Sequence, residues 1–365
     1  MKILYIITGL GVGGAEIQLK NIVDKLVMLD HDVHIISLVD PVIIKPESNK
    51  VCITCLDMKK NLVSFLVSLL RIRKVIIRYR PDVVHSHMVH ANLIVRVCRL
   101  FTRIKFLVCT AHSNIEGGRL IKFFYRITNG LCDVFSHVSH SGIKKFECDS
   151  VVRSNEMICI ENGIDLNRFQ KKNKSIVKTI RDKLNIADSQ YMLLAVGSFK
   201  EAKDYPNLIR CLEHLKRRKL PVVLVIIGDG HLKDDISELI IQLDLVDDVR
   251  LIGQTHDVEN YMSAADCFVL SSRWEGFGMV VAEAMACKCP IVITECGGAP
   301  EVAGEVGITV PINDSTKLAD AIYQVYTMEE EKLNYILEKG RLRVMENFCL
   351  DSIVGRWLKV YLNKK

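Results

Sequence analysis

Short apolar runs alternate with helically spaced segments along this chain, and this alternation limits its possible folds more than any other feature. In the first half, the apolar runs expected to form strands are 2–8, 33–39, 51–56, 82–86, 106–110, 134–138 and 158–160. Segments with helical spacing of apolar residues separate these runs, at 15–29, 62–79, 93–101 and 120–129. Strands that alternate with helices predict a parallel sheet that is covered on both faces.

A polar segment at 171–175 is interpreted as a linker, and a second alternating series follows it. The strands expected in this series are 192–196, 222–227, 249–252, 267–270 and 291–294. The expected helices are 205–216, 232–243, 258–263, 279–287, 316–326, 330–346 and 351–362. The chain has 365 residues, which suits two domains. We therefore predict an α/β protein of two doubly wound, Rossmann-like parallel-sheet domains, with ligands bound at the carboxyl ends of the strands in a cleft between them.

The composition is that of a globular protein. Hydrophobic residues make up 49% of the chain and charged residues 25%, which excludes a disordered protein. The 13 cysteines are scattered through apolar runs, where free thiols pack as small hydrophobic groups, so we expect a reducing cytoplasmic environment. The apolar N-terminal run leads directly into a Gly-rich turn and lacks a small-residue cleavage site, so we expect no signal peptide.

Positive charge is concentrated in one segment of the first half. Between Lys59 and Lys105 there are 11 basic residues and one acid, Asp82. The basic residues are Lys59, Lys60, Arg71, Arg73, Lys74, Arg78, Arg80, Arg96, Arg99, Arg103 and Lys105. The apolar residues interleaved with them are Leu62, Phe65, Leu66, Leu69, Leu70, Phe101 and Phe106. This pattern is typical of a basic amphipathic face on anionic lipid headgroups, and an ordinary solvated helix face is the alternative.

A Gly-rich loop, Gly9-Leu10-Gly11-Val12-Gly13-Gly14, follows the first expected strand. It fits the G-x-G-x-x-G fingerprint of dinucleotide-binding oxidoreductases, and Asp40, at the end of the second expected strand, would be the ribose-binding acid. However, Gly9 and Asp40 are 31 positions apart in the sequence, whereas the fingerprint expects about 20. This spacing disfavours an oxidoreductase.

Several smaller motifs leave alternatives open. Cys52 and Cys55 form a C-x-x-C pair inside an expected strand, with no second pair at zinc-ligand spacing. The Asp30-His31-Asp32 run lies in an expected turn, which explains it better than metal binding does. The three histidines of the fourth expected strand and the loop after it would contact an acceptor, bind a metal or simply pack; they are His85, His87 and His90.

Two further positions have the right residue type and place for chemistry. His112 follows the expected strand 106–110 directly, on a loop that also contains Asn114. Lys203 lies on a loop before the expected helix 205–216, where it could neutralise a diphosphate as a point charge. A solvated loop lysine is the alternative for Lys203.

Two carboxylates frame the stretch of residues 271–283. Glu275 lies on a loop before Gly276-Phe277-Gly278, and Glu283 lies in the helix expected to follow. The free N–H groups at the start of that helix would favour a phosphate. A well-capped core helix is the alternative interpretation.

Taken together, five motifs resemble the retaining GT-B glycosyltransferases of family 4, of the polysaccharide and O-antigen biosynthesis type. These motifs are SSRWEGFGMVVAEAMACKCPIVITECGGAPE, VGSFKEAKDYPNLI, IIGDGHL, IENGIDLNRF and GVGGAE. The resemblance implies an acceptor-binding N-terminal domain at 1–170 and a nucleotide-sugar-binding C-terminal domain at 171–346. It also implies that the last helix, at 347–365, returns to the N-terminal domain.

The resemblance also implies roles for individual residues. Glu283 would bind the ribose hydroxyls, Glu275 the donor sugar, and Lys203 the leaving diphosphate. His112 would face the transferred sugar, so the residues implied in catalysis are Glu275, His112 and Lys203. The implied donor-binding positions are Gly13, Gly14, Ser198, Lys203, Gly253, Glu275, Gly276, Phe277, Gly278, Met279, Val280 and Glu283. The implied acceptor-binding positions are His85, His87, His112 and Asn114.

One position departs from the family pattern. Ser198 stands where these enzymes usually carry an arginine that completes a clamp on the diphosphate. The clamp would therefore rely on Lys203 alone, or borrow Lys200.

The resemblance implies transfer of a sugar, with retention, from a UDP-sugar to a hydroxyl of a polyprenyl-diphosphate-linked saccharide in bacterial surface polysaccharide assembly. We expect an N-acetylhexosamine donor, GalNAc or GlcNAc, no metal or other cofactor, no nucleic acid partner, and peripheral association with the inner face of the plasma membrane. A UDP-sugar 2-epimerase on the same fold, a mannosyl- or galactosyltransferase of the family, and a non-catalytic nucleotide-sugar-binding protein are the alternatives.

Overall fold

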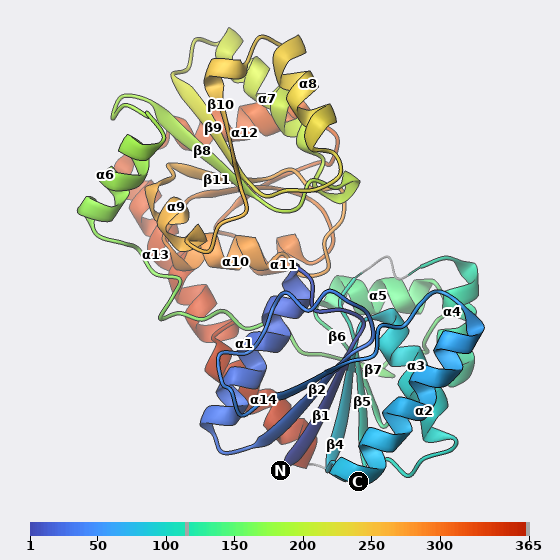
Figure 1. Ribbon diagram of the computed structural model, residues 1–365. Coiled ribbons are helices and arrows are strands. Elements are labelled where there is room, and N and C mark those ends of the chain that lie inside the picture. The colour runs from blue at the N-terminus through green and yellow to red at the C-terminus, as the bar shows by residue number, and fades with distance from the viewer. Residues whose placement is uncertain (114–116, 363–365) are drawn as a thin grey trace. The chain divides into compact units, whose positions relative to one another are not determined.

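The chain forms two compact α/β units in the computed structural model, which describes residues 1–113 and 117–362 (Figure 1). Unit 1 comprises Met1–Gly163 and Leu350–Lys365, and unit 2 comprises Ile164–Cys349. The sequence analysis placed the boundaries at 170 and 346. A β-bridge between Ile164 and Cys349 explains the difference, because it ties both ends of unit 2 together.

Unit 1 contains a parallel sheet of seven strands in the order β3-β2-β1-β4-β5-β6-β7. The strands are β1 (Lys2–Ile7), β2 (Asp32–Ser37), β3 (Cys52–Cys55), β4 (Val83–His87), β5 (Leu107–Ala111), β6 (Val134–His137) and β7 (Met157–Cys159). The helices are α1 (Gly14–Met28), α2 (Leu62–Tyr79), α3 (Val89–Arg99), α4 (Arg119–Thr128), η1 (Asn129–Leu131), α5 (His140–Cys148) and α14 (Leu350–Leu362).

The side chains of β1 alternate between two hydrophobic cores, one on each face of this sheet. Leu4 and Ile6 pack in the core that contains residues of α2, α3, α4 and α5. Ile3, Tyr5 and Ile7 pack in the core that contains residues of α1 and α14. Successive side chains of a strand point to opposite faces, so a strand covered by helices on both faces is apolar throughout.

Unit 2 contains a parallel sheet of six strands in the order β10-β9-β8-β11-β12-β13. The strands are β8 (Tyr191–Val196), β9 (Val222–Ile227), β10 (Val249–Gly253), β11 (Cys267–Leu270), β12 (Ile291–Thr294) and β13 (Ile308–Val310). The helices are α6 (Lys174–Lys183), η2 (Glu201–Lys203), α7 (Tyr205–Arg217), α8 (Lys233–Gln242), η3 (Val246–Asp248), α9 (Val258–Ala264), α10 (Met279–Ala286), α11 (Ala299–Ala303), α12 (Ser315–Tyr326) and α13 (Glu330–Asn347).

The predicted two-sheet α/β architecture is confirmed, but several short elements were missed. The linker prediction at 171–175 is wrong from Lys174 onward, because α6 begins there. Asn173 caps this helix by accepting a hydrogen bond from the Ile176 N–H at 3.0 Å. Strand β13, helix α5 and helix α11 were also missed, because three to nine residues are too few to show a clear period.

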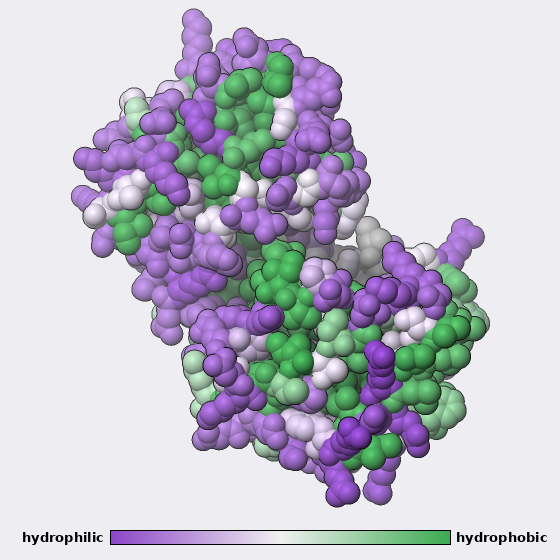
Figure 2. Space-filling model, viewed as in Figure 1, coloured by the Kyte–Doolittle hydropathy of each residue, from purple (hydrophilic) through white to green (hydrophobic). Residues whose placement is uncertain are grey.

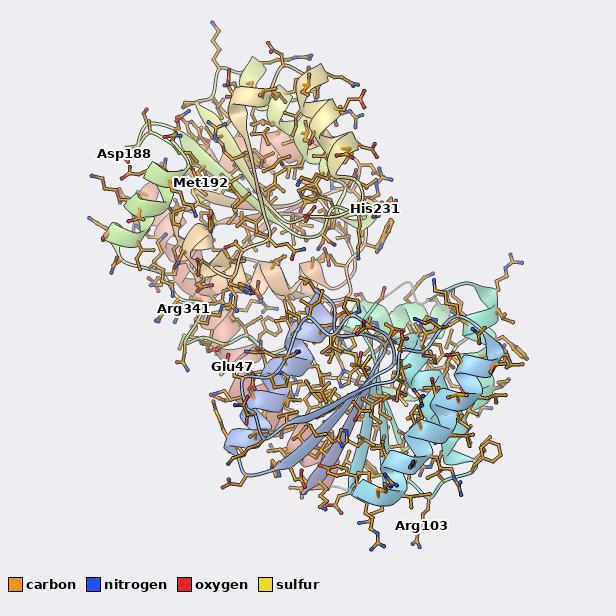
Figure 3. The ribbon with its side chains drawn as sticks, in the orientation of Figure 1. Glu47, Arg103, Asp188, Met192, His231 and Arg341 are labelled. Atoms are coloured by element: carbon orange, nitrogen blue, oxygen red, sulfur yellow. The ribbon has the colours of Figure 1, made fainter. Side chains whose placement is uncertain are left out.

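Not every residue of the predicted basic face between Lys59 and Lys105 is exposed. Arg96 is fully buried, with its guanidinium carbon 4.4 Å from the centre of the Phe135 ring. Leu69 and Phe106 are buried as well, because they belong to the two cores of unit 1. Arg103, by contrast, is exposed and points outward from unit 1 (Figure 3).

Candidate active site

Lys203 and Glu275, two of the residues predicted to take part in catalysis, meet in unit 2. The Lys203 Nζ lies 2.5 Å from Glu275 Oε1, and the Ser272 hydroxyl donates a hydrogen bond to the same oxygen at 2.7 Å. The exposed fractions of the lysine and glutamate side chains are 19% and 13%. A charge-assisted contact that is this short and this shielded holds both side chains in one arrangement.

Two neighbouring strands explain why these residues meet. Strands β8 and β11 are adjacent and parallel, so the loops after them leave the sheet at the same edge. The Ser271 hydroxyl donates to the Lys203 carbonyl oxygen at 2.8 Å, and the Arg273 N–H donates to the Ala202 carbonyl oxygen at 2.8 Å. This is the carboxyl edge of the sheet, where ligands bind in doubly wound folds.

Gly278 is the N-cap residue of α10 and has a conformation that favours glycine. Its φ is 91°, and a Cβ at this position would lie 3.3 Å from the Cα and Cβ of Ala299. No side chain caps the helix at Gly278, and the first N–H groups of a helix have no partner within the helix. The start of α10, with Met279 and Val280 as its first residues, therefore suits an anion.

Glu283 lies within α10 and is buried. Burial raises the pKa of its carboxyl from the usual 4.5 to about 7, against the opposing effect of the Arg168 guanidinium. A carboxyl group that titrates near neutral pH can both accept and donate hydrogen bonds. Such a group suits a pair of sugar hydroxyls.

The other predicted donor-binding residues of unit 2 differ in how far their side chains are exposed to solvent. Ser198 and Gly276 are half-buried on the loops after β8 and β11. Phe277 is buried, and its ring centre lies 5.4 Å from that of Phe348. Because this ring is buried beside Phe348, only the backbone of Phe277 is left for a ligand. Gly253 ends β10, which β9 separates from β8.

Ser272 and the pair of Asp204 and Arg273 were missed by sequence reasoning. Arg273 Nε lies 3.0 Å from Asp204 Oδ2, and the Asp204 side chain is only 2% exposed. Asp204 follows Lys203 directly, and Arg273 lies two positions before Glu275. In the sequence, the feature that could have indicated them is their position next to the predicted site residues.

In unit 1, the buried His87 pairs with the half-buried His112. His87 Nδ1 lies 2.8 Å from His112 Nε2, because β4 and β5 are adjacent and both histidines lie at their carboxyl ends. Burial lowers the pKa of His87 well below its usual range. Burial, followed by the charge of His137, lowers the pKa of His112 to about 3. Both rings are therefore neutral at pH 7.

His85 lies in the middle of β4, although the sequence analysis placed it where a strand meets a loop. It is fully buried, with Nδ1 2.7 Å from the Tyr361 hydroxyl and Nε2 2.7 Å from the Thr110 hydroxyl. With both ring nitrogens engaged, His85 offers nothing to an acceptor, and it instead ties α14 to the sheet. His90 is an exposed residue of α3.

Three other predictions concern the loops of unit 1. Gly13 and Gly14 form the start of α1, and the Ile17 N–H donates to the Gly13 carbonyl oxygen at 3.1 Å. A ribose-binding acid would have to lie at the end of the second strand. Strand β2 ends at Ser37, so Asp40 lies three residues beyond it. Asn114 lies outside the described residues.

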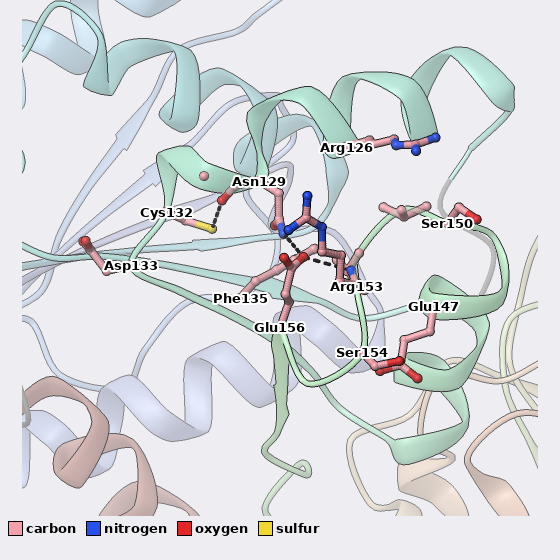
Figure 4. Close-up of a pocket in the computed structure, with 13 residues that line it drawn as sticks. Arg126, Asn129, Cys132, Asp133, Phe135, Glu147, Ser150, Arg153, Ser154 and Glu156 are labelled. Atoms are coloured by element: carbon pink, nitrogen blue, oxygen red, sulfur yellow. Dashed lines mark hydrogen bonds between the residues drawn. The ribbon is translucent and has the colours of Figure 1, made fainter.

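A pocket of about 860 Å³ lies at the amino ends of β6 and β7 in unit 1 (Figure 4). Its lining residues are Arg126, Asn129, Gly130, Cys132, Asp133, Phe135, Glu147, Ser150, Val151, Val152, Arg153, Ser154 and Glu156. None of the predicted site residues within the described ranges lines this pocket. His87 and His112 lie at the opposite, carboxyl edge of the same sheet.

Two protein families match the two halves of the chain. Residues 12–168 match the family described as Glycosyltransferase Family 4, and residues 177–343 match the family described as Glycosyl transferases group 1.

Curated relatives carry related names. A protein of Bacillus anthracis named N-acetyl-alpha-D-glucosaminyl L-malate synthase is 30% identical over 63% of this chain, and the match spans only 59% of that protein. The N-acetylgalactosamine-N,N'-diacetylbacillosaminyl-diphospho-undecaprenol 4-alpha-N-acetylgalactosaminyltransferase of Campylobacter jejuni is 26% identical, over 91% of both chains. The O-antigen biosynthesis glycosyltransferase WclY of Escherichia coli is 23% identical, over 100% of this chain and 98% of its own.

Solved structures show the same fold. The structure of Anabaena Alr3699/HepE in complex with UDP and glucose superposes with a TM-score of 0.85 at 20% identity, over 100% of both chains. Together, the two family matches and the two Rossmann-like sheets show that this chain belongs to the group 1 glycosyltransferases, with the GT-B fold.

Proposed function

We propose that this glycosyltransferase moves a sugar, with retention of configuration, from a UDP-sugar to a hydroxyl of a polyprenyl-diphosphate-linked saccharide. The observation that carries the proposal is the Lys203–Glu275 pair, at 2.5 Å, on the loops after β8 and β11. Unit 2 contains a cation at Lys203, a helix start without a side-chain cap after Gly278, and the buried carboxyl of Glu283. These are the groups that a diphosphate and a ribose need.

The leaving diphosphate is the difficult part of this reaction. As the bond from the sugar C1 to the β-phosphate oxygen breaks, negative charge grows on that oxygen. Lys203 and the N–H groups at the start of α10 would stabilise this charge without rearranging during the step. The acceptor oxygen bonds to C1 on the same face, and its proton passes to the departing phosphate oxygen. We propose that transfer needs no metal, because Lys203 supplies the cation.

The names of the relatives support an N-acetylhexosamine donor and a lipid-linked acceptor. The Bacillus anthracis name specifies an N-acetylglucosaminyl group, and the Campylobacter jejuni name specifies an N-acetylgalactosaminyl group and a diphospho-undecaprenol acceptor. The Escherichia coli name places that relative in O-antigen biosynthesis. We propose the same setting for this chain.

Exposed apolar residues on unit 1 support contact with the membrane that carries such an acceptor. On α2 and α4, their exposed fractions range from 42% to 72%. They are Leu62, Val63, Leu66, Val67, Leu70 and Ile77 on α2, and Leu120, Phe123, Phe124 and Ile127 on α4. Apolar surface appears in Figure 2 where Figure 1 labels α2 and α4. Among the described residues, no helix is long and apolar enough to cross a bilayer.

Basic residues on α2 complete this amphipathic surface. Arg71, Arg73, Lys74 and Arg78 are exposed on the same helix. Apolar side chains that enter the headgroup region and basic side chains that meet anionic lipids are the two contributions that hold peripheral helices on membranes. We propose that this surface places the protein on the inner face of the plasma membrane.

A ligand screen tests the donor. UDP-GalNAc, UDP-GlcNAc, UDP-glucose and GDP-mannose are compared by thermal unfolding of the whole chain. A ligand at 100 times its dissociation constant stabilises the folded state by about 2.7 kcal/mol. We expect the UDP-N-acetylhexosamines to give the largest shift. If GDP-mannose stabilises the protein and every UDP-sugar fails, the donor proposal is wrong.

A product assay tests the reaction class. The protein is incubated with the preferred UDP-sugar and a polyprenyl-diphosphate-linked saccharide, with and without EDTA. We expect a lengthened lipid-linked product whose new bond keeps the anomeric configuration of the donor, at the same rate in EDTA. Release of a free epimerised sugar without an acceptor would instead indicate a 2-epimerase.

A further inference from the structure

Three side chains of unit 1 that have no role in the proposed transfer gather at one place. They are His140, Cys159 and Glu161, and one potential metal-ligating atom of each lies within 4.8 Å of the others. His140 is the first residue of α5, Cys159 is the last residue of β7, and Glu161 follows two positions later. Two different segments of the chain thus contribute to one cluster.

The local fold brings these segments together. His137 of β6 is the register partner of Cys159, and the Ile160 N–H donates to the His137 carbonyl oxygen at 3.1 Å. The pairing therefore continues one residue beyond β7. In an extended chain, residues two apart face the same side, which places the Cys159 and Glu161 side chains together.

The cap of α5 fixes the third member. The Ser139 hydroxyl accepts a hydrogen bond from the Gly142 N–H at 3.2 Å, and the Ser139 N–H donates to His137 Nδ1 at 3.1 Å. Since Ser139 is held at both groups, the chain turns directly from β6 into α5. His140 consequently starts the helix beside the end of β7.

Arg356 of α14 contacts two members of the cluster, Glu161 and Cys159. Its Nη1 donates to Glu161 Oε2, and its Nη2 donates to the Cys159 carbonyl oxygen at 2.9 Å. The first contact leaves the second carboxylate oxygen of Glu161 for another partner. Hydrogen bonds of this kind orient the ligands of metal sites.

We propose that His140, Cys159 and Glu161 bind a zinc ion. An imidazole nitrogen, a thiolate and a carboxylate are the donor types that zinc takes, and three protein ligands leave the fourth tetrahedral position to water. Bonds of about 2.0–2.3 Å from zinc place donor atoms within about 4 Å of one another. Donor atoms already within 4.8 Å need only small side-chain rotations to reach that spacing.

The charges of the cluster also suit a dication. Binding converts the Cys159 thiol to a thiolate and releases its proton to solvent. The thiolate and the Glu161 carboxylate then carry two negative charges, and the Arg356 guanidinium carries one positive charge. The net charge of −1 that remains attracts a zinc ion.

Cobalt provides a spectroscopic test on the full chain. Protein stripped of metal with a chelator is titrated with Co²⁺, whose bond to a thiolate gives a charge-transfer absorption band, and the cobalt is then displaced with Zn²⁺. The titration uses the Cys52→Ser/Cys55→Ser double variant, because those two exposed thiols could bind metal themselves. We expect one equivalent of metal and an intact charge-transfer band in this background.

Single substitutions then locate the site. Cys159→Ser should abolish the charge-transfer band, and His140→Ala should weaken zinc binding by about tenfold or more, the scale of losses at tuned metal sites. Cys148→Ser is the matched control, because this exposed thiol ends the same helix, α5, and should leave binding unchanged. His140 is exposed, so we expect its removal to keep the fold, and thermal unfolding of the variant without ligand checks this.

Two results would overturn the proposal. The first is a charge-transfer band that persists in Cys159→Ser, and the second is zinc affinity that His140→Ala leaves unchanged. Because binding is read without sugar transfer, either result leaves the proposed transferase function standing.

Discussion

At the scale of single residues, Lys203 and Glu275 show how a polar pair can be held ready for a ligand. Each side chain neutralises the other, and the Ser272 hydroxyl fixes the glutamate oxygen at 2.7 Å. An arriving diphosphate would take Lys203 as its cation, and Glu275 would be released toward the sugar. The pair therefore keeps both groups ordered before the donor binds.

Lys203→Ala should lower kcat by roughly 10²–10³-fold, because it removes the cation proposed to stabilise the leaving diphosphate. Steady-state kinetics with the preferred UDP-sugar measure this loss. Lys200→Ala is the control, since Lys200 is exposed on the same loop. An equal loss in Lys200→Ala would mean that the clamp borrows Lys200, and an unchanged kcat in Lys203→Ala would contradict the proposed role.

Glu283 should make stability depend on pH. Its pKa is raised from 4.5 to about 7 in the folded state, so the folded protein holds the proton more tightly than the unfolded chain. The free energy of unfolding therefore falls as pH rises from about 4.5 to about 7, by roughly 3 kcal/mol from this group.

Glu283→Gln should remove that contribution. Urea unfolding of both proteins at pH 5 and pH 8 measures it, and the variant should lose less stability between the two pH values than the wild type does. Identical pH dependence in the two proteins would show that Glu283 titrates normally. Comparing the two proteins cancels the effect of the buried histidines, which are present in both.

At the scale of elements, α2 and α4 expose apolar surface that water does not favour. Burial of apolar area stabilises by roughly 25 cal/mol per Å², so a lipid surface offers these helices a favourable environment. The sequence had indicated α2 through its basic residues. It had not indicated α4, whose apolar residues became relevant only when the structure showed which of them are exposed.

Phe123→Glu/Ile127→Glu on α4 should weaken binding to anionic vesicles more than tenfold. The two substitutions remove apolar contacts and add charges that the anionic surface repels. Co-sedimentation with vesicles containing phosphatidylglycerol measures the loss, and Ile241→Glu, at an exposed apolar position of unit 2, serves as the control. Equal binding of the variant and the wild type would refute the proposed surface.

Helix α14 is a second element with a clear structural task. Trp357 and Tyr361 are buried in the core of unit 1 that also contains residues of α1. The Tyr361 hydroxyl lies 2.9 Å from that of Tyr5 and 2.7 Å from His85 Nδ1. The C-terminal segment thus completes unit 1, which also contains the start of the chain.

Trp357→Ala should destabilise the protein by about 3–5 kcal/mol, because it leaves a cavity in that core. Thermal unfolding detects the loss. Leu362→Ala is the control, because Leu362 is exposed on the same helix and should change stability little. A small effect of Trp357→Ala would mean that α14 contributes little to unit 1.

At the scale of the whole molecule, the groups suited to a donor belong to unit 2, and the pair of His87 and His112 belongs to unit 1. Hydrogen exchange with and without UDP separates their contributions. We expect UDP to protect residues 197–203 and 271–283, the loops after β8 and β11 with α10. Protection at Gly13 and Gly14 would support their predicted role in donor binding, and no protection in unit 2 would contradict the donor site.

The sequence by itself determined the two-sheet architecture, and it supplied the candidate donor residues that the proposal rests on. Short continuous apolar runs, separated by segments with an apolar period of 3.6, are local properties that can be recognised without knowledge of contacts. The sequence also indicated a special backbone conformation before α10, through Gly278. The structure gives this residue a positive φ, which glycine adopts readily.

Only the tertiary structure decided which side chains are buried and which meet. Arg96 looked like a surface charge and His85 like a ligand, yet both are fully buried. Lys203 and Glu275 are 72 positions apart, and the pairing of β6 with β7 brings Cys159 close to His140. Burial and contact depend on strand order and helix placement, which no local pattern contains.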